Sequence, residues 1–289
     1  MTDNDCVAFL QWALPRLRMR WPGFRKVRRQ VCKRISRRMG ELGLEDVGEY
    51  RGLLETHEEE WKKLDECCRI TISRFFRDRE VFQTLQGVVL PRLAECVGRE
   101  GRTEVRCWSA GCGSGEEPYT LSLIWRLTPD DGQIESLSRR FPRLSLRVTA
   151  TDAYPKVLDR AREGVYPRGA LKDLPPSWLP LAFQEVDRGL SLRPSFREGV
   201  SVLAQDIREA WPDGSFDLIL CRNLVFTYFE ERLQREILES LLHRLRQGGF
   251  LVIGGHEAVP EGEWPLTQWR QGLPVFMKGD RPPGGQLDI

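Results

Sequence analysis

The chain has 289 residues, of which 40% are hydrophobic and 30% charged, a composition typical of soluble globular proteins. Lys and Arg number 44 against 42 Asp and Glu, and a formal net charge of +2 argues against a strongly basic nucleic-acid-binding protein. No apolar run approaches the ~18–20 residues that span a bilayer, and the acidic, polar first residues lack the basic start of a signal peptide. We therefore expect a cytosolic protein that does not insert into membranes.

Many of the cations lie near the N-terminus. Residues 16–38 contain eleven Lys and Arg residues and no Asp or Glu. Val27, Val31, Ile35 and Met39 recur every four residues there, which predicts a helix with one apolar stripe and cations on its other faces.

Further helical patterns at 46–60 and 59–70 complete a small all-helical N-terminal domain, expected over residues 1–70 and followed by a linker over 71–80. From 81 to 289, helix and strand patterns alternate. Strands are expected at 105–110, 144–151, 200–204, 216–221 and 250–253, with an antiparallel pair within 266–277. Helices are expected at 80–96, 118–126, 155–162 and 229–245, the last capped by Gly248 and Gly249.

This alternation predicts the α/β class, with a doubly wound, mostly parallel sheet. Residues 167–199 carry Pro175-Pro176 and a Gly/Pro-rich stretch, which predicts a short inserted subdomain. At ~150 residues per domain, the length agrees with two domains.

Eight cysteines are scattered along the chain without a CxxC motif, and the three histidines are not at metal-ligand spacing from them. We therefore expect no metal site, and we interpret the cysteines as reduced, structural thiols.

A glycine-rich turn follows the first expected strand, with Gly111, Gly113 and Gly115 preceding Glu116 and Glu117. Such a turn allows a ligand to approach the backbone closely. Carboxylates at the start of the next helix would repel a phosphate and suit a cationic or hydroxyl-bearing ligand. The alternative is a plain strand-to-helix turn whose glutamates stabilise the helix dipole.

Polar residues also follow three other expected strands. Asp152 ends the second strand, where a carboxylate can accept hydrogen bonds from ribose hydroxyls. Asp206 follows the third, where it can accept an exocyclic amine of a base, and Arg222-Asn223 follow the fourth. Four polar strand ends at one edge of a sheet indicate a site for an adenosine without phosphates.

The sequence at this point resembles the CheR-type chemotaxis-receptor methyltransferases, which use S-adenosylmethionine to methylate glutamate side chains. The resemblance extends from about residue 27 to 277. It is carried by Ile72-Ser-Arg-Phe-Phe-Arg-Asp78, Trp108-Ser-Ala-Gly-Cys-Gly-Ser-Gly-Glu-Glu-Pro-Tyr119, Ala150-Thr-Asp152, Cys221-Arg-Asn223 with Tyr228-Phe229, and Gly254-Gly-His-Glu257. It implies a class I methyltransferase-like fold, S-adenosylmethionine as cofactor with S-adenosylhomocysteine as product, and a monomer.

The resemblance also implies roles for single residues. Thr71, Ser73 and Arg77 would line the amino-acid end of the cofactor, beside the turn of Gly111 and Gly113. Glu117 would bind its ammonium group, Asp152 its ribose, and Asp206 with Ile207 its adenine. Arg222, Asn223 and Tyr228 would form the wall near the reactive methyl.

Arg77 and Tyr228 are the candidate catalytic residues, for orienting the carboxylate or the cofactor. Arg34, Arg37 and Arg38 on the basic helix would face the substrate, an acidic helical protein such as the cytoplasmic region of a chemoreceptor. The alternatives without a functional role are that Ser73 and Arg77 only cap a helix and keep its end in contact with solvent, and that Arg34 is one more surface cation.

The expected chemistry needs no general base, because a glutamate with an unperturbed pKa of ~4.3 is already ionised at neutral pH. Alignment and desolvation are the main requirements of an in-line methyl transfer.

The chain departs from the family at several positions. Tyr228 follows Asn223 by five residues instead of four, Asp206 and Thr71 replace asparagines, the Gly-His-Ser-Glu block lacks its serine, and the inserted subdomain is shortened. Two other functions stay open: a methyltransferase of the same fold acting on RNA or a small molecule, and a non-catalytic module that binds the cofactor.

Overall fold

The computed structural model describes residues 2–128 and 135–279, and the chain divides into two compact units. The first unit contains the chain up to Thr71 together with Asn223–Glu236, and the second contains the rest. The first division lies next to the boundary expected at residue 70. The contribution of 223–236 to the first unit was not expected, because nothing in its local sequence pattern marks a return to the N-terminal helices.

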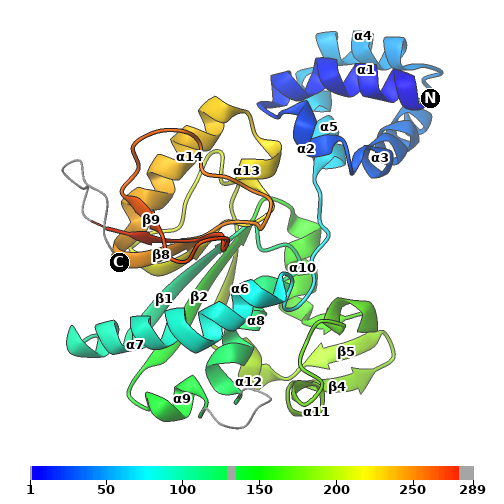
Figure 1. Ribbon diagram of the computed structural model, residues 1–289. Coiled ribbons are helices and arrows are strands. Elements are labelled where there is room, and N and C mark those ends of the chain that lie inside the picture. The colour runs from blue at the N-terminus through cyan, green and yellow to red at the C-terminus, as the bar shows by residue number, and fades with distance from the viewer. Residues whose placement is uncertain (1, 129–134, 280–289) are drawn as a thin grey trace. The chain divides into compact units, whose positions relative to one another are not determined.

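The first unit is all-helical, as expected (Figure 1). Its helices are α1 (Asp3–Ala13), a 3-10 turn (Leu14–Leu17), α2 (Trp21–Phe24), α3 (Arg28–Glu41), α4 (Val47–Thr56), α5 (Glu58–Cys68), α13 (Val225–Tyr228) and the first turns of α14 (Glu231–Arg244). Thr2 and Asp5 form a capping box at the start of α1, and the Asp46 side chain caps α4. The helix expected over 46–60 is interrupted at His57, whose backbone is extended.

The apolar stripe of α3 is buried as predicted. Val31 and Ile35 are fully buried and Met39 nearly so, whereas Val27 precedes the helix as its N-cap. The interpretation of all eight cysteines as reduced thiols is wrong for two of them, because Cys6 of α1 and Cys32 of α3 form a disulfide. Their Cα atoms lie 5.9 Å apart, within the range that a disulfide bridges.

The segment 223–236 packs on α2. The ring centroids of Phe24 and Tyr228 are 5.1 Å apart, and the amide of Arg20 donates to the carbonyl of Tyr228 at 2.8 Å. A Cβ on Gly23 would lie 2.2 Å from the carbonyl oxygen of Thr227, so only glycine fits at this crossing.

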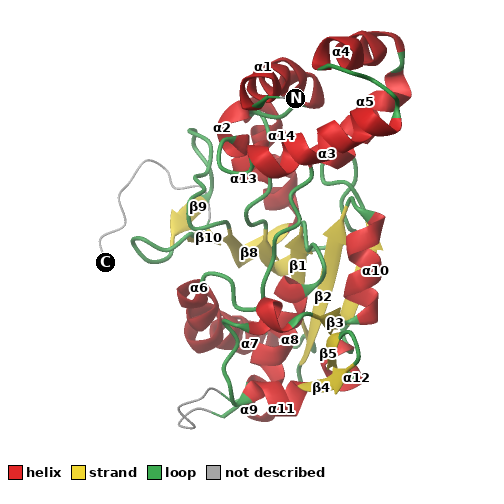
Figure 2. Ribbon diagram, turned by 90° about the vertical axis from the view of Figure 1, so that its right-hand side faces the viewer, coloured by secondary structure: helices red, strands yellow, loops and turns green. Residues whose placement is uncertain are grey.

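The second unit is built on a seven-stranded sheet in the order β6-β2-β1-β7-β8-β10-β9 (Figure 2). The strands are β1 (Glu104–Ala110), β2 (Ser145–Asp152), β6 (Val200–Ala204), β7 (Phe216–Leu220), β8 (Leu245–Val252), β9 (Leu266–Gln268) and β10 (Val275–Lys278). The first five are parallel, and β10 pairs antiparallel with β8 and β9. This confirms the expected class, and β1 lies at the point where strand order reverses between β2 and β7.

The second unit contains the last turns of α14 and a further set of helices. They are α6 (Arg79–Thr84), a π-helical turn (Leu85–Val89), α7 (Leu90–Arg99), α8 (Glu116–Arg126), α9 (Leu137–Arg140), α10 (Pro155–Glu163), α11 (Trp178–Ala182) and α12 (Pro194–Arg197). None of the described helices in either unit is long and apolar enough to cross a bilayer.

Two expected details are wrong. The single helix expected over 80–96 is interrupted by the π turn, beside Pro91, which has no N–H to donate to the preceding turn. Gly248 and Gly249 do not cap a helix: α14 ends at Arg244, and the glycines lie in the register shift of β8. A Cβ on Gly249 would lie 2.9 Å from the carbonyl oxygen of Asp217 in β7, so the bulged strand passes too close for a side chain.

The inserted subdomain is a separate antiparallel sheet in the order β3-β5-β4, with strands β3 (Val165–Tyr166), β4 (Phe183–Val186) and β5 (Gly189–Leu192). A 3-10 turn (Arg168–Leu171) follows β3.

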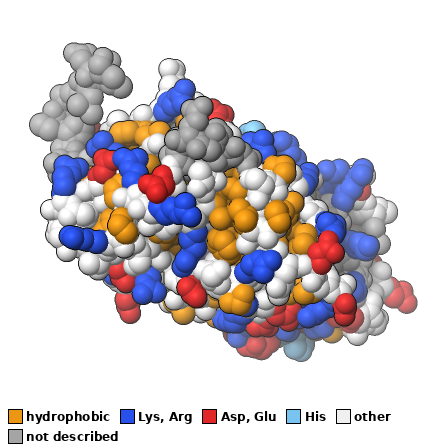
Figure 3. Space-filling view, turned by 90° about the horizontal axis from the view of Figure 1, so that it is seen from below, with side chains coloured by type: hydrophobic (Ala, Val, Ile, Leu, Met, Phe, Trp, Pro, Cys, Tyr) orange, Lys and Arg blue, Asp and Glu red, His pale blue; other side chains and the backbone are white. Residues whose placement is uncertain are grey.

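Figure 3 shows acidic and basic side chains interspersed around a hydrophobic patch on one face of the protein. On that face, charge is mixed rather than segregated.

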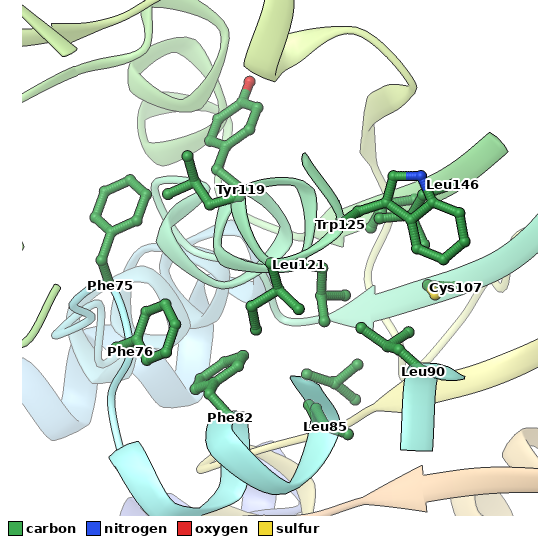
Figure 4. Packing of buried hydrophobic residues seen from close by; sticks show 14 of the residues in the cluster. Phe75, Phe76, Phe82, Leu85, Leu90, Cys107, Tyr119, Leu121, Trp125 and Leu146 are labelled. Atoms are coloured by element: carbon green, nitrogen blue, oxygen red, sulfur yellow. The ribbon is translucent and has the colours of Figure 1, made fainter. Parts of the chain in front are cut away.

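The main core joins one face of the sheet to the segment that enters the unit. Phe75 and Phe76 come from that segment and pack with residues of α6 and α8, among them Phe82 and Leu121 (Figure 4). Phe75 also makes edge-to-face contacts with Tyr166 and Phe183 of the inserted sheet. The aromatic pair thus fixes the start of the unit against both sheets.

Candidate functional site

The polar strand ends predicted from the sequence meet at one edge of the sheet. The amides of Gly111 and Cys112, after β1, donate to the carbonyl of Thr151 in β2 at 2.8 and 2.9 Å. The amide of Gln205, after β6, donates to the carbonyl of Asp152 at 3.1 Å. In open α/β sheets, ligands bind at this carboxyl edge, beside the point where strand order reverses.

The glycine-rich turn has the backbone conformation that its sequence predicts. Gly111, Gly113 and Gly115 all have positive φ values, of 76°, 56° and 92°. The Asp152 carboxylate accepts a hydrogen bond from the Gly113 amide at 3.0 Å and another from the Tyr154 amide at 2.9 Å. Asp152 is therefore oriented at the carboxyl edge by two backbone donors, one in the glycine-rich turn and one after β2.

Glu117 lies in the first turn of α8 and is held at both carboxylate oxygens. Ser109 of β1 donates its hydroxyl to Oε1 at 2.7 Å, and Arg222 donates from Nη1 to Oε2 at 2.9 Å. Ser109 is fully buried. Ser109 is not among the predicted site residues, although its place in the last part of β1, two residues before the glycine-rich turn, is a signal that could identify it.

Arg222 is buried just after β7 and holds a second segment of the chain. Its Nη2 donates to Asp78 Oδ2 at 2.6 Å and to the backbone carbonyl of Arg77 at 2.8 Å. Its guanidinium lies 5.0 Å from the centroid of the Phe82 ring. Asp78 belongs to the Ile72–Asp78 motif but is not among the predicted site residues.

The segment that precedes α6 follows a constrained path. Phe76 and Asp78, on either side of Arg77, have φ values of 54° and 64°, a left-handed conformation that is uncommon for such residues. The Arg77 side chain donates to the carbonyl of Ile72 at 2.9 Å. A Cβ on Gly113 would lie 3.9 Å from the Cβ of Ser73, so this segment runs beside the glycine-rich turn.

Glu116 is a buried carboxyl group that is not among the predicted site residues. Only 4% of its surface is exposed, and burial raises its pKa above the usual range, while hydrogen bonds that include one from Ser73 act in the opposite direction. Its Oε2 atom has no hydrogen-bond partner among the described residues.

Asp206 and Ile207 follow β6, as predicted, but the Asp206 carboxylate is occupied. Arg208 contacts it through Nε and Nη2, with a shortest distance of 2.6 Å, and its amide donates to Oδ1 at 2.9 Å. Ile207 is buried. An adenine at this position would therefore share the carboxylate with Arg208.

Three of the residues predicted to lie at the cofactor belong to the first unit. Thr71 is its last residue before the division, and Asn223 has a φ of 54°, which asparagine tolerates better than most residues. Tyr228 ends α13 and packs on Phe24. Their predicted roles at the cofactor stay predictions.

The three arginines expected to face the substrate have different surroundings within the first unit. Arg34 binds the backbone carbonyls of Cys67 and Arg69 at the end of α5. Arg38 forms a two-point ion pair with the buried Glu60, at 2.9 and 2.8 Å. The Arg37 side chain is 74% exposed, with a 3.6 Å contact to Glu41.

The site fits S-adenosylmethionine in two respects. Asp78 and Glu117 surround one guanidinium, which leaves a net negative charge suited to a ligand cation. The buried Glu116 Oε2 and Arg222 Nε have no partner in the described part of the chain, so an acceptor and a donor remain. No group of three His, Cys, Asp or Glu residues in the same part of the chain is arranged to hold a metal ion.

Comparisons with known proteins agree with this assignment. Residues 71–271 match the family model of the S-adenosylmethionine-binding domain of CheR methyltransferases, and residues 26–65 match that of the CheR all-alpha domain. A chemotaxis protein methyltransferase of Listeria monocytogenes is 33% identical over 66% of this chain and 66% of its own length. The Escherichia coli chemotaxis protein methyltransferase is 30% identical over 80% of this chain and 76% of its own.

An uncharacterized 104.1 kDa protein of Rhodobacter capsulatus is 29% identical over 89% of this chain, which spans only 28% of that protein. The family-model match covers more than half of the chain and includes every predicted site residue of the second unit. The chain therefore belongs to the CheR family of S-adenosylmethionine-dependent methyltransferases.

Proposed function

We propose that this protein transfers a methyl group from S-adenosylmethionine to glutamate side chains of an acidic, helical protein, namely the cytoplasmic region of a chemoreceptor. The observation that carries the proposal is the clamped Glu117 carboxylate, an oriented acceptor for the cofactor's ammonium group at the edge where Asp152 can accept ribose hydroxyls. The names of the relatives support the substrate class.

The bound cofactor supplies an electrophilic methyl group. On the protein side, Glu117 and Asp152 bind and orient, Asp206 and Ile207 contact the base, and Arg77 and Tyr228 orient the reacting groups. No residue needs to act as a base, because the substrate carboxylate is ionised at neutral pH. The protein would act in the cytoplasm as a monomer, and its partner is a protein rather than a nucleic acid.

The basic helix α3 supplies the charge for docking an acidic substrate. Arg29, Lys33 and Arg37 are exposed and follow one another at intervals of four residues, so they form a basic face opposite the buried stripe. The run over 16–38 carries +11 of formal charge, so the rest of the chain carries −9 to give the total of +2. The overall balance therefore conceals a local attraction for acidic surfaces.

The activity is tested with methyl-labelled S-adenosylmethionine and purified chemoreceptor fragments. Base-labile label on glutamate is the expected product. Base-stable label, label on RNA, or binding of the cofactor without turnover on any acidic protein would contradict the proposal.

The docking face is tested by the K33E/R37E double variant. It should lower the rate of receptor methylation at least tenfold at low salt and leave S-adenosylhomocysteine affinity unchanged. The control is K62E, because Lys62 is also exposed on a helix of this unit and has a glutamate three residues away. Arg34 and Arg38 are avoided, since both have partners within the fold.

A further inference from the structure

Arg222 connects two parts of the second unit that are 105 and 144 residues away from it in the sequence. One contact is with Glu117 at the start of α8, and the other is with Asp78 and the Arg77 carbonyl before α6. The Arg222 side chain is only 2% exposed. A guanidinium is planar and presents its N–H donors in fixed directions, so a buried one holds its partners in a defined geometry.

The first contact fixes the direction of the Glu117 carboxylate. Arg222 and Ser109 each bind one of its oxygens, at 2.9 and 2.7 Å, and the Glu117 side chain keeps 13% of its surface exposed. A carboxylate has about four lone-pair positions, so two remain for another donor. The clamp thus orients the group without saturating it.

The second contact fixes the backbone around Arg77. Phe76 and Asp78 are both left-handed, a conformation that is unfavourable for residues with a side chain. Such conformations persist where surrounding contacts determine them. Here the Phe76 amide donates to Thr120, and Arg222 binds the next two residues.

The charges of this cluster select a cation. Glu117 and Asp78 together carry two negative charges against one positive charge on Arg222. The excess is one negative charge: the Arg222 and Glu117 side chains are buried, whereas the Asp78 side chain is 39% exposed. A ligand with a compact cationic group would balance that charge. The α-ammonium group of the cofactor meets that description.

We propose that Arg222 is a positioning residue of the cofactor site: it aims Glu117 at the α-ammonium group and, through the same guanidinium, fixes the corner that carries Arg77. Ser109 is its counterpart on the other Glu117 oxygen. The inference rests on the proposed function only for the identity of the cofactor, and not for that of the methyl acceptor.

The test measures binding by calorimetry for S-adenosylhomocysteine and for its analogue that lacks the amino group. In R222M, affinity for S-adenosylhomocysteine should fall about ten- to hundredfold, the effect of losing a charge-assisted hydrogen bond to a buried group. Affinity for the desamino analogue should change less than threefold. Equal losses for the two ligands would show a merely structural role and overturn the proposal.

The matched control is R102M. Arg102 also makes a two-point ion pair with a buried carboxylate, that of Asp217, but at the opposite end of the strands. R102M should lower stability and leave both affinities within twofold. A loss of affinity in R102M as selective for S-adenosylhomocysteine as that in R222M would also overturn the proposal.

A milder pair of variants keeps the test decisive if R222M does not fold. S109A should weaken S-adenosylhomocysteine binding about three- to tenfold and leave the desamino analogue unchanged. S122A is its control, because Ser122 is a buried serine whose hydroxyl donates to the carbonyl of Phe196. Unchanged binding in S109A would contradict the inference. Receptor methylation is assayed separately, so a wrong methyl acceptor would not affect these results.

Discussion

Replacing Arg38 by methionine should destabilise the first unit by leaving a buried carboxylate without its cation. In the wild-type protein, Arg38 Nε and Nη2 donate to the two oxygens of Glu60 at 2.9 and 2.8 Å, and the Tyr50 hydroxyl donates to Glu60 Oε1 at 2.9 Å. Glu60 is 8% exposed. After the substitution, only the tyrosine hydrogen bond would remain of these three.

The size of the effect follows from the burial of the pair. Removing one partner of a fully buried ion pair costs about 3–5 kcal/mol. The Arg38 side chain is 26% exposed, so water can reach part of the site in the variant. We therefore expect a loss of about 2–3 kcal/mol in the free energy of unfolding at pH 7.

This loss should depend on pH. The Arg38 guanidinium lowers the pKa of Glu60 in the folded protein. A lowered carboxyl pKa contributes stability above its unfolded value of about 4.5, and that contribution disappears as the pH falls through the folded pKa. The difference between wild type and R38M should accordingly be largest at neutral pH and shrink below pH 4.5.

The assay is urea unfolding followed by far-UV circular dichroism at pH 7 and pH 4. R37M is the control, because Arg37 is the preceding residue of the same helix and its side chain is 74% exposed. It should change stability by less than about 0.5 kcal/mol. The reasoning is refuted if R38M and R37M are equally stable at pH 7, or if the R38M loss is as large at pH 4.

Three further changes test the packing. Reducing the Cys6–Cys32 disulfide, whose cysteines are 26 residues apart, should lower the stability of the first unit by roughly 3–4 kcal/mol. The measurement is thermal unfolding with and without reductant, and an unchanged midpoint would contradict the pairing. G23A should lower the melting temperature of that unit, because its Cβ would overlap the Thr227 carbonyl, and wild-type stability would refute the close crossing. F75A should cost about 3–5 kcal/mol in urea unfolding, since the fully buried ring leaves a cavity between two sheets, and a loss under 1 kcal/mol would show that the contacts are not formed.

The features that the sequence predicted well depend on local pattern. Alternation of strands and helices determined the parallel sheet, and the positions where strands end placed Gly111, Asp152, Asp206 and Arg222 along one edge of it. These predictions succeed because parallel strands share a direction, so residues that end them come together whatever the loops do.

The features that the sequence did not predict are tertiary contacts, which depend on the residue that each side chain meets in the folded protein. Arg34, Arg37 and Arg38 have the same local sequence pattern. Arg34 and Arg38 nevertheless form hydrogen bonds with residues 22 to 35 positions away in the sequence, whereas the contact described for Arg37 is with Glu41 on its own helix. Asp206 was predicted to accept an exocyclic amine of a base, and its ion pair with Arg208 is a further contact that the sequence did not predict. Helical periodicity gives the face of a residue and carries no information on these tertiary contacts.

Residues 223–236 pack with the N-terminal helices, and this limits which segments of the protein can be exchanged with those of a relative. Arg18 pairs with Glu230 and Glu236, and Met19 forms a β-bridge with Phe229. A chimera that exchanges only the first 71 residues with those of a relative would set foreign helices against a native α13. A chimera of this kind should therefore fold stably only when both segments are exchanged together.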